Sequence, residues 1–268
     1  MAHLINAPVV YVIGVWRFPR LVDFAGVPAA IQRKLRKEYP HYENLDAPHF
    51  HVDVDADGTV NMKRESVVLH QYAAPDRKSA VFVHDSLVAF HTIAYRDHAD
   101  FFDRFLGCVD AIKSVDEVEI EYVDQIGLRY VDLITPNGDD RLEDYLVEGV
   151  LPSDIKGVDG LQIQDGVSAA RYRTASGRLR LQALRRPPMV LPPELQSPMT
   201  VALKWDFPLP TGDFAVLDTD HGTTFEKSPR VNELNFRDVL TALRAPISDV
   251  FKAVTTEHAS RVWAGEAG

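Results

Sequence analysis

Hydrophobic periodicity divides the chain into buried strands and amphipathic helices. Residues 9–18 (VVYVIGVWRF) are β-branched and aromatic, which predicts a buried strand. Apolar residues recur every four positions over 24–39 and gather on one side of 97–114, so both segments are predicted to be helices. An apolar stripe also runs through 229–262, where we expect Pro246 to kink the helix or to start a new one.

Turn-forming residues between alternating segments predict three β-hairpins. The paired segments are 49–54 with 59–69, 79–84 with 87–95, and 161–173 with 178–185. Two further strands are expected, one over 117–134 with a bend or bulge near Gly127, and one over 199–207. The five prolines in 186–198 predict an irregular surface loop between elements.

Strands occur in runs and are followed by helices, without βαβ alternation. This order predicts an α+β fold of antiparallel sheets, built from hairpins packed against amphipathic helices. The turn cluster at 135–139 is the best candidate boundary between two halves. We therefore expect an N-terminal α+β half (1–135) and a C-terminal α+β half with a long C-terminal helix (136–268), with one continuous domain as the alternative.

Composition narrows the class of protein. The net charge of −10 argues against a surface built for nucleic acid, although a local basic patch remains compatible with it. The single cysteine, Cys108, lies in an apolar helical pattern and is expected to be a buried hydrophobe. With no signal-like N-terminus and no apolar run near 18 residues, we expect a cytoplasmic protein without membrane contact.

One acidic stretch resembles half of a calcium-binding loop. Asp53, Asp55 and Asp57, followed by Gly58, match the first half of an EF-hand loop. The twelfth position of such a loop holds a glutamate that binds calcium with both oxygens, and Arg64 stands there instead. The stretch is therefore interpreted as the turn of a hairpin.

A second candidate metal site combines histidines and acids on one strand. His49, His51 and Asp53 share one face of a predicted strand, and the Asp218–His221 stretch (Asp218, Asp220, His221) is the source considered for a further ligand. Exposed strands also carry polar residues at alternate positions without any metal. The sequence is therefore interpreted as having no metal site, with the His49 face as the open alternative, and no cofactor.

Motifs of catalysis and nucleotide binding are missing from the sequence. There is no Gly-x-Ser-x-Gly elbow, no Gly-x-Gly-x-x-Gly and no Gly-x-x-x-x-Gly-Lys-Ser/Thr. The sequence therefore assigns no catalytic residue and favours a protein without enzymatic activity.

Arginine placement is the most informative chemical feature. Six arginines and no acid occur between Gly166 and Pro193, in a chain of net charge −10. Period-two spacing places Arg171 with Arg173, and Arg178 with Arg180, on strand faces either side of a predicted turn. Guanidinium groups bind carboxylates and phosphates, so these four form the candidate site for an anion or an acidic partner. The alternative is a solvated strand face paired with acids from elsewhere in the chain.

Arg129 is a separate case, because it interrupts an otherwise apolar strand. An arginine there requires a paired carboxylate or an exposed position. We expect a structural ion pair.

Short motifs spread along the chain resemble a sporadically distributed bacterial family of uncharacterised proteins of about 250 residues. They are the Asn6–Val10 start, Tyr39-Pro40, Tyr95 before Phe101-Phe102, the Gly127–Tyr130 strand motif, and the helix pattern Leu243, Ile247, Phe251 and Thr255. Asp132 departs from the pattern, which leads us to expect asparagine. The resemblance implies no catalytic residues, and its patchy distribution is typical of accessory or defence-associated genes.

Two functional hypotheses follow. The first is a non-enzymatic binding protein, such as an accessory, antitoxin-like or defence-associated partner, that meets an acidic protein. The second is an enzyme or ligand-binding domain for a phosphorylated or anionic small molecule. A deep pocket lined by the arginines would favour the second hypothesis, and a flat exposed face would favour the first. A homodimer is compatible with both.

Overall fold

The computed structural model describes residues 6–54, 60–116, 118–152, 155, 159–196 and 199–266, with side chains except at 47–54, 60–67, 199 and 201. Nine strands form one sheet in the order β2-β3-β4-β5-β1-β6-β9-β8-β7, and every neighbouring pair is antiparallel. The strands are β1 (Val9–Arg17), β2 (His41–Val54), β3 (Val60–Ala73), β4 (Ser79–His84), β5 (Leu87–Thr92), β6 (Gln125–Ile134), β7 (Gly166–Thr174), β8 (Gly177–Arg185) and β9 (Ala215–Thr224). The predicted α+β class is confirmed, and strands from both sides of residue 135 share the one sheet.

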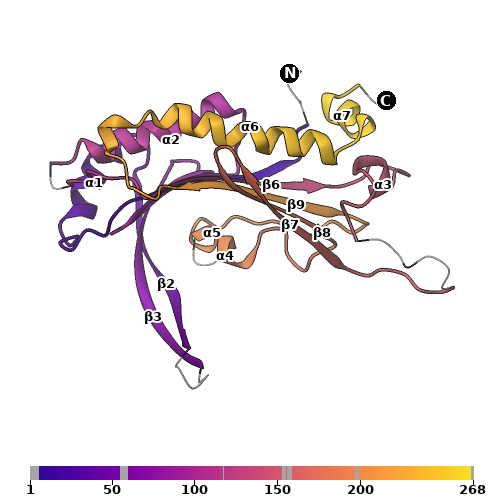
Figure 1. Ribbon diagram of the computed structural model, residues 1–268, viewed down its shortest axis with the longest axis horizontal. Coiled ribbons are helices and arrows are strands. Elements are labelled where there is room, and N and C mark those ends of the chain that lie inside the picture. Colours follow the sequence, from indigo (N-terminus) through magenta and orange to yellow (C-terminus); the bar gives the residue numbers. More distant parts are fainter. Residues whose placement is uncertain are drawn as a thin grey trace.

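Helices lie on both sides of this sheet. They are α1 (Val27–Leu35), α2 (His98–Lys113), α3 (Leu142–Tyr145), α4 (Pro193–Gln196), α5 (Met199–Ala202), α6 (Phe236–Val254) and α7 (Glu257–Ala264), with a 3₁₀ turn at Val231–Glu233. Figure 1 shows α1, α2 and α6 along one face, and the short helices α4 and α5 beneath the other. No helix within the described ranges has the length and apolar character needed to cross a membrane.

The sheet has an apolar core on each face because its central strands are buried on both sides. The helical face packs Trp16 and Leu128 of the sheet against Phe105 of α2 and Leu240 of α6. On the opposite face, a second core joins the sheet to the segment 186–214. We call this opposite side the loop face.

The helix predicted over 97–114 is confirmed as α2. The Asp97 side chain accepts a hydrogen bond from the Asp100 amide at 2.9 Å, which caps the first turn. Cys108 is buried as predicted, and burial raises the pKa of its thiol to about 12. The thiol is therefore protonated and packs as an apolar side chain.

Helix α6 continues through Pro246 instead of ending there. Proline has no N–H, so the Ala242 carbonyl loses its usual helical donor. The Ser176 hydroxyl donates to that carbonyl at 3.0 Å, and His221 Nδ1 donates to the neighbouring Leu243 carbonyl at 2.6 Å. The β7–β8 turn thus supplies the one hydrogen bond that the proline removes from the helix, and β9 adds a second at the next carbonyl.

The strand predictions from the sequence contain two errors and one omission. Regular strand begins only at Gln125 in the segment 117–134, and pairing runs through Gly127 without a shift, since the irregularity lies between Val9 and Tyr11. Residues 199–207 form α5 and a turn instead of a strand, because their alternating apolar side chains pack Leu203 and Trp205 onto the loop face. The central strand β9 was not anticipated, since its alternation includes polar residues that the fold buries.

The predicted hairpins at 79–84/87–95 and 161–173/178–185 appear as β4–β5 and β7–β8. The first hairpin is longer than expected, with β2 and β3 paired from His41 to Val54. Only His70–Ala73 of β3 also pairs with β4, so the rest of this hairpin extends beyond the sheet (Figure 1).

Candidate functional site

The four arginines of the candidate site lie on one face of the β7–β8 hairpin. Arg171 is directly opposite Arg180, and Arg173 is directly opposite Arg178. Directly opposed residues point to the same side of a sheet, as do residues two apart in one strand. The shared face predicted from the sequence is therefore confirmed, and we call these four residues the arginine face.

The hairpin turn fixes this register. Ala175 and Ser176 form a two-residue turn between the paired residues Thr174 and Gly177. Gly177 has a φ of +147°, and a Cβ at this position would lie 2.1 Å from the Gly222 carbonyl oxygen of β9. Only glycine fits this close approach. On the other side of β8, Leu179 is buried in the helical-face core, so the arginines must point toward the loop face.

His221 of β9 secures the same turn from the helical side. Its Nδ1 donates to Leu243, so its Nε2 accepts the Thr174 hydroxyl hydrogen bond at 2.8 Å. Burial lowers the pKa of the imidazole, although the Leu243 carbonyl opposes that shift, and the neutral form suits this arrangement. The turn is therefore held by the sheet and by α6 together.

One member of the arginine face, Arg180, joins a buried ion-pair network. Arg129 of β6 forms a two-pronged pair with Asp218 of β9, with Nε–Oδ1 and Nη2–Oδ2 distances of 2.6 and 2.8 Å. Arg129 also donates to Glu194 of α4 at 2.8 Å. Arg180 reaches the same Asp218 carboxylate at 3.3 Å and lies 3.9 Å from Asp220. The structural ion pair expected for Arg129 is confirmed.

Charge balance explains why this network is stable inside the fold. Burial alone would lower the pKa of the Arg129 guanidinium, but the hydrogen bonds that it donates to Asp218 and Glu194 raise it. Burial likewise raises the pKa of Glu194, and the Arg129 hydrogen bond outweighs it, so that pKa falls. Both shifts favour the charged forms of Arg129 and Glu194.

The other three members of the arginine face have no such partners. Arg171, Arg173 and Arg178 are exposed, and no carboxylate in the described part of the chain forms an ion pair with them. By contrast, Arg185 pairs with Asp213 at 2.5 Å and Arg186 pairs with the same residue at 3.3 Å. Of the six arginines in the acid-free stretch, three form ion pairs within the fold and three face solvent.

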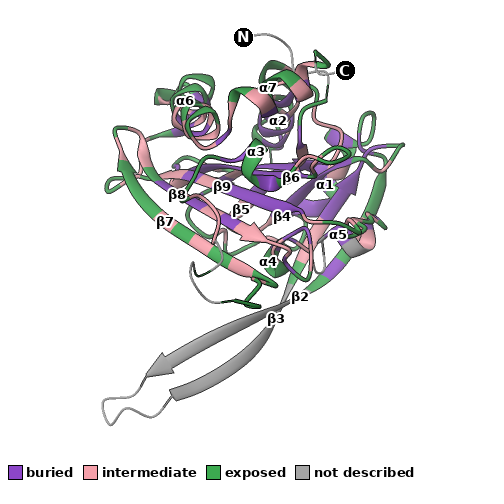
Figure 2. Ribbon diagram, turned by 90° about the vertical axis from the view of Figure 1, so that its right-hand side faces the viewer, coloured by how far each residue is buried: buried purple, intermediate pink, exposed green. Residues whose placement is uncertain are grey.

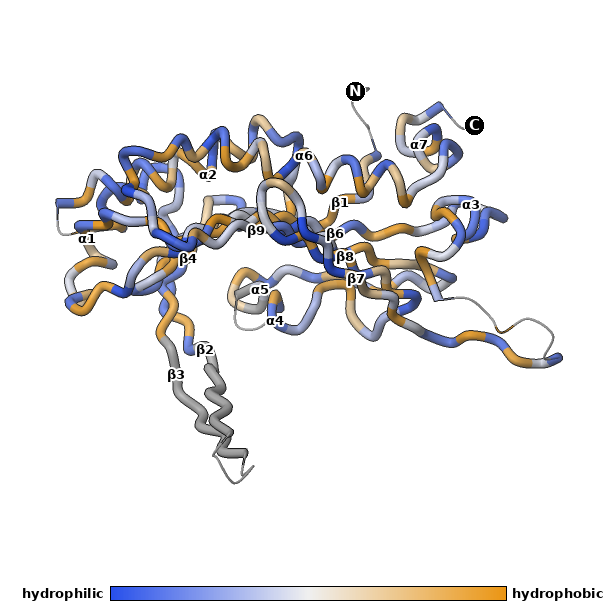
Figure 3. Tube along the Cα trace, in the orientation of Figure 1, coloured by the Kyte–Doolittle hydropathy of each residue, from blue (hydrophilic) through white to orange (hydrophobic). Residues whose placement is uncertain are grey.

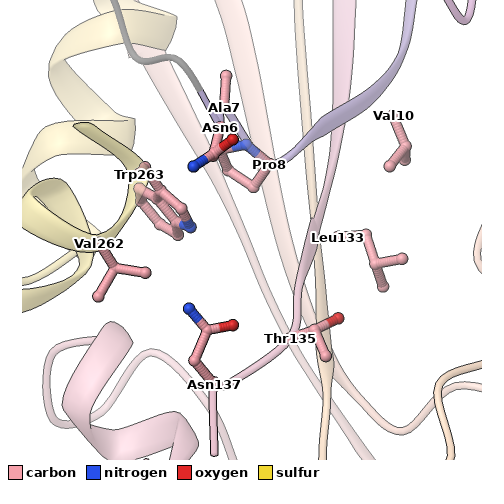
Figure 4. A pocket seen from close by; sticks show the side chains of 9 residues that line it. All are labelled: Asn6, Ala7, Pro8, Val10, Leu133, Thr135, Asn137, Val262 and Trp263. Carbon is pink, nitrogen blue, oxygen red and sulfur yellow. The ribbon is translucent and has the colours of Figure 1, made fainter. Parts of the chain in front are cut away.

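The arginine face is open to solvent, because three of its four side chains are exposed. Figure 2 shows β7 as an outer strand coloured mostly exposed, and Figure 3 shows the hydrophilic stretch of the same hairpin. A cavity of about 370 Å³ lies elsewhere, between the N-terminal segment, the end of β6 and α7 (Figure 4). Its lining is Asn6, Ala7, Pro8, Val10, Leu133, Thr135, Asn137, Val262 and Trp263, which contains no charged side chain.

The candidate metal ligands that lie within the described residues are not close to one another. Asp55, Asp57 and Gly58 lie outside the described residues, as do the side chains of His49, His51 and Asp53. Five strands separate β2 from β9 in the sheet, so the Asp218–His221 stretch does not complete a site on β2. Asp218 and His221 instead point to opposite faces, toward Arg129 and Thr174. Among the described residues, no three potential ligands form a metal-binding cluster.

The sequence analysis did not identify the acids that form ion pairs with Arg129 and Arg180. Asp218 and Asp220 alternate along β9 and directly face Gln182 and Arg180 of β8. The signal was present in the Asp-Thr-Asp spacing, which places two acids on one strand face. Glu194 gave no signal, because it reaches the sheet from the proline-rich loop.

Comparison with known proteins adds no assignment to this geometry. The sequence matches no protein-family model, and it matches no curated protein.

Proposed function

We propose that this chain is a non-enzymatic binding protein whose arginine face captures an acidic surface of a partner protein. The observation that carries the proposal is the trio Arg171, Arg173 and Arg178, exposed on one sheet face without carboxylate partners among the described residues. Like charges on adjacent strands repel each other, so this arrangement costs stability unless something negative binds to it. An acidic partner would offset that cost and add charge-assisted hydrogen bonds.

The alternative, an enzyme or binding domain for an anionic small molecule, has less support. Small-molecule sites are usually concave and bury most of the ligand. The cavity in Figure 4 contains no arginine, and Arg129 already donates hydrogen bonds to Asp218 and Glu194. An open strand face suits a macromolecular surface better than a small anion.

We propose a cytoplasmic location and an accessory or defence-associated role for this partner binding. The buried, protonated Cys108 is compatible with a reducing compartment. The accessory role rests on the resemblance to a patchily distributed bacterial family.

Quantitative capture from native lysate tests the proposed function. The tagged protein is compared with Arg173→Ala/Arg178→Ala and with a control, Lys34→Ala/Lys37→Ala, that removes two exposed positive charges from the α1 region. We expect the arginine variant to lose a defined acidic protein that both other baits retain, and the wild-type complex to weaken as salt rises. Equal capture by all three baits would contradict the proposal.

Folding of the arginine variant is checked separately. Both side chains are exposed and lack ion-pair partners in the described chain, so the free energy of unfolding should change by less than about 0.5 kcal/mol. A large loss of stability would show that the arginines have a structural role instead.

A further inference from the structure

The outermost strand of the sheet, β7, has an open hydrogen-bonding edge next to the arginine face. It pairs with β8 without a register shift from Gly166 to Thr174, and the described chain places no strand on its other side. Edge strands are usually protected by prolines, bulges, short length or a covering segment. This one is nine residues long, has no proline and no bulge, and is charged only at Arg171 and Arg173.

The turn determines which backbone groups point outward. Thr174 and Gly177 close a two-residue turn, so they form a hydrogen-bonded pair, and such pairs alternate along an antiparallel ladder. The N–H and C=O groups of Val167, Ala169, Arg171 and Arg173 therefore point away from β8. These same four residues project their side chains to the loop face, where all four are exposed.

The geometry points to strand addition: we propose that an extended acidic segment of the partner pairs with β7 as a tenth strand, with its acids opposite Arg171 and Arg173. This inference rests on the proposed function and specifies its binding mode. A strand added there would find two arginines at alternate positions, then Ala169 and Val167 further along. The fitting segment therefore carries two acids followed by two apolar residues, each at every second position.

A second copy of this chain is a poorer occupant. The β7 sequence, Gly166–Thr174, contains no acid, so a copy paired through its own β7 would offer the arginines no carboxylate to pair with. Each chain also carries a net charge of −10, which adds repulsion between copies. Charge complementarity thus favours an acidic segment from another protein.

A synthetic peptide tests the binding mode. The probe is Glu-Thr-Glu-Thr-Val-Thr-Val, which places acids opposite the arginines and valines opposite Ala169 and Val167 in an antiparallel pairing. Its controls are the lysine-for-glutamate peptide and a peptide N-methylated at both valines, which keeps the charge but loses the two N–H groups that would face β7. Affinity is measured by fluorescence anisotropy, and protection of the β7 amides by hydrogen exchange.

Two matched variants isolate the backbone contribution. Ala169→Pro removes one outward N–H without breaking the β8 ladder, and Ala169→Val keeps that N–H while adding comparable bulk. We expect Ala169→Pro to weaken the probe about tenfold or more, Ala169→Val to change it little, and the Val167, Ala169, Arg171 and Arg173 amides to gain protection.

The outcomes separate this inference from the proposed function. Binding that is lost in Arg171→Ala/Arg173→Ala, but is unaffected by Ala169→Pro and gives no amide protection, would overturn strand addition and leave the arginine face standing. Binding that is insensitive to the arginine changes would overturn both.

Dimerisation abolished by Ala169→Pro would assign the edge to a second copy, and preference for a single-stranded oligonucleotide over the acidic peptide would assign it to nucleic acid. Either result would overturn the proposal.

Discussion

Arg129 retains its charge within the sheet because Asp218 meets it with both carboxylate oxygens. Asp218 is fully buried and Arg129 is 8% exposed, so neither ion can recover its hydration if the other is removed. Breaking a buried pair is therefore much more costly than replacing it with apolar side chains. The pair provides a direct test of the network beneath Arg180.

We expect Arg129→Met to destabilise the protein by about 3–5 kcal/mol, because it leaves the buried Asp218 carboxylate with only the longer contact from Arg180. The double change Arg129→Met/Asp218→Leu should recover most of that loss. Urea unfolding of the wild type, both single variants and the double variant gives the coupling energy. A loss below about 1 kcal/mol in Arg129→Met would mean that the pair does not stabilise the fold.

Asp132 is a buried residue of the sheet whose protonation makes the stability of the fold depend on pH. It is 3% exposed, and burial, with a smaller contribution from the Asp218 charge, raises its pKa to about 7. An unfolded aspartate releases its proton near pH 3.9. Folding therefore takes up a proton between about pH 4 and 7, and the contribution of Asp132 to stability falls as pH rises through this window.

The Asp132→Asn variant, which carries the residue that the family resemblance leads us to expect, should remove this dependence. Relative to wild type, it should gain stability at pH 8 compared with pH 4.5, as measured by urea unfolding at both values. His91, whose pKa burial lowers to about 3, opposes Asp132 over part of this range. Because His91 is common to both proteins, the difference between them isolates Asp132, and a difference that is independent of pH would refute the assignment.

Among the elements, α2 shows how closely the helices approach the sheet. Phe105 is fully buried, and a Cβ added at Gly14 of β1 would lie 2.9 Å from its ring. The glycine therefore makes room for the aromatic side chain, and the two positions are expected to be coupled.

Phe105→Ala should cost about 3–5 kcal/mol, as deletions of buried aromatic side chains do. Gly14→Ala alone should cost about 1–3 kcal/mol through overpacking. The double variant should cost less than the sum of the two, because the new methyl group fills part of the cavity. Additive losses in thermal or urea unfolding would show that the ring does not pack on Gly14.

The elements that could be predicted from the sequence are those whose local pattern agrees with their burial. Helix α2 and the β4–β5 hairpin have clear periodicity and turn residues, and both appear close to their expected bounds. Strand β9 was missed because its buried polar residues, Asp218 and His221, find partners only in the folded protein. The 199–207 segment was misassigned because alternation alone does not distinguish a strand from a loop that packs two side chains inward.

For the whole molecule, charge is distributed unevenly across a chain with a net charge of −10. The sequence predicted that the four arginines share a face if the strands pair through the turn at 175–177, and the observed register meets that condition. It could not predict that Arg180 alone would be neutralised, since its acids come from β9 and α4. The exposed trio is therefore a property of the tertiary fold.

The salt dependence of binding tests the central claim most directly. The affinity of the Glu-Thr-Glu-Thr-Val-Thr-Val peptide is measured from about 50 to 500 mM NaCl for wild type and for Arg171→Ala/Arg173→Ala/Arg178→Ala. We predict that wild-type affinity falls steeply with salt, and that the triple variant binds about tenfold or more weakly at low salt with a much flatter dependence. Equal affinity and equal salt dependence in the two proteins would contradict the claim that the unpaired arginines bind an acidic partner.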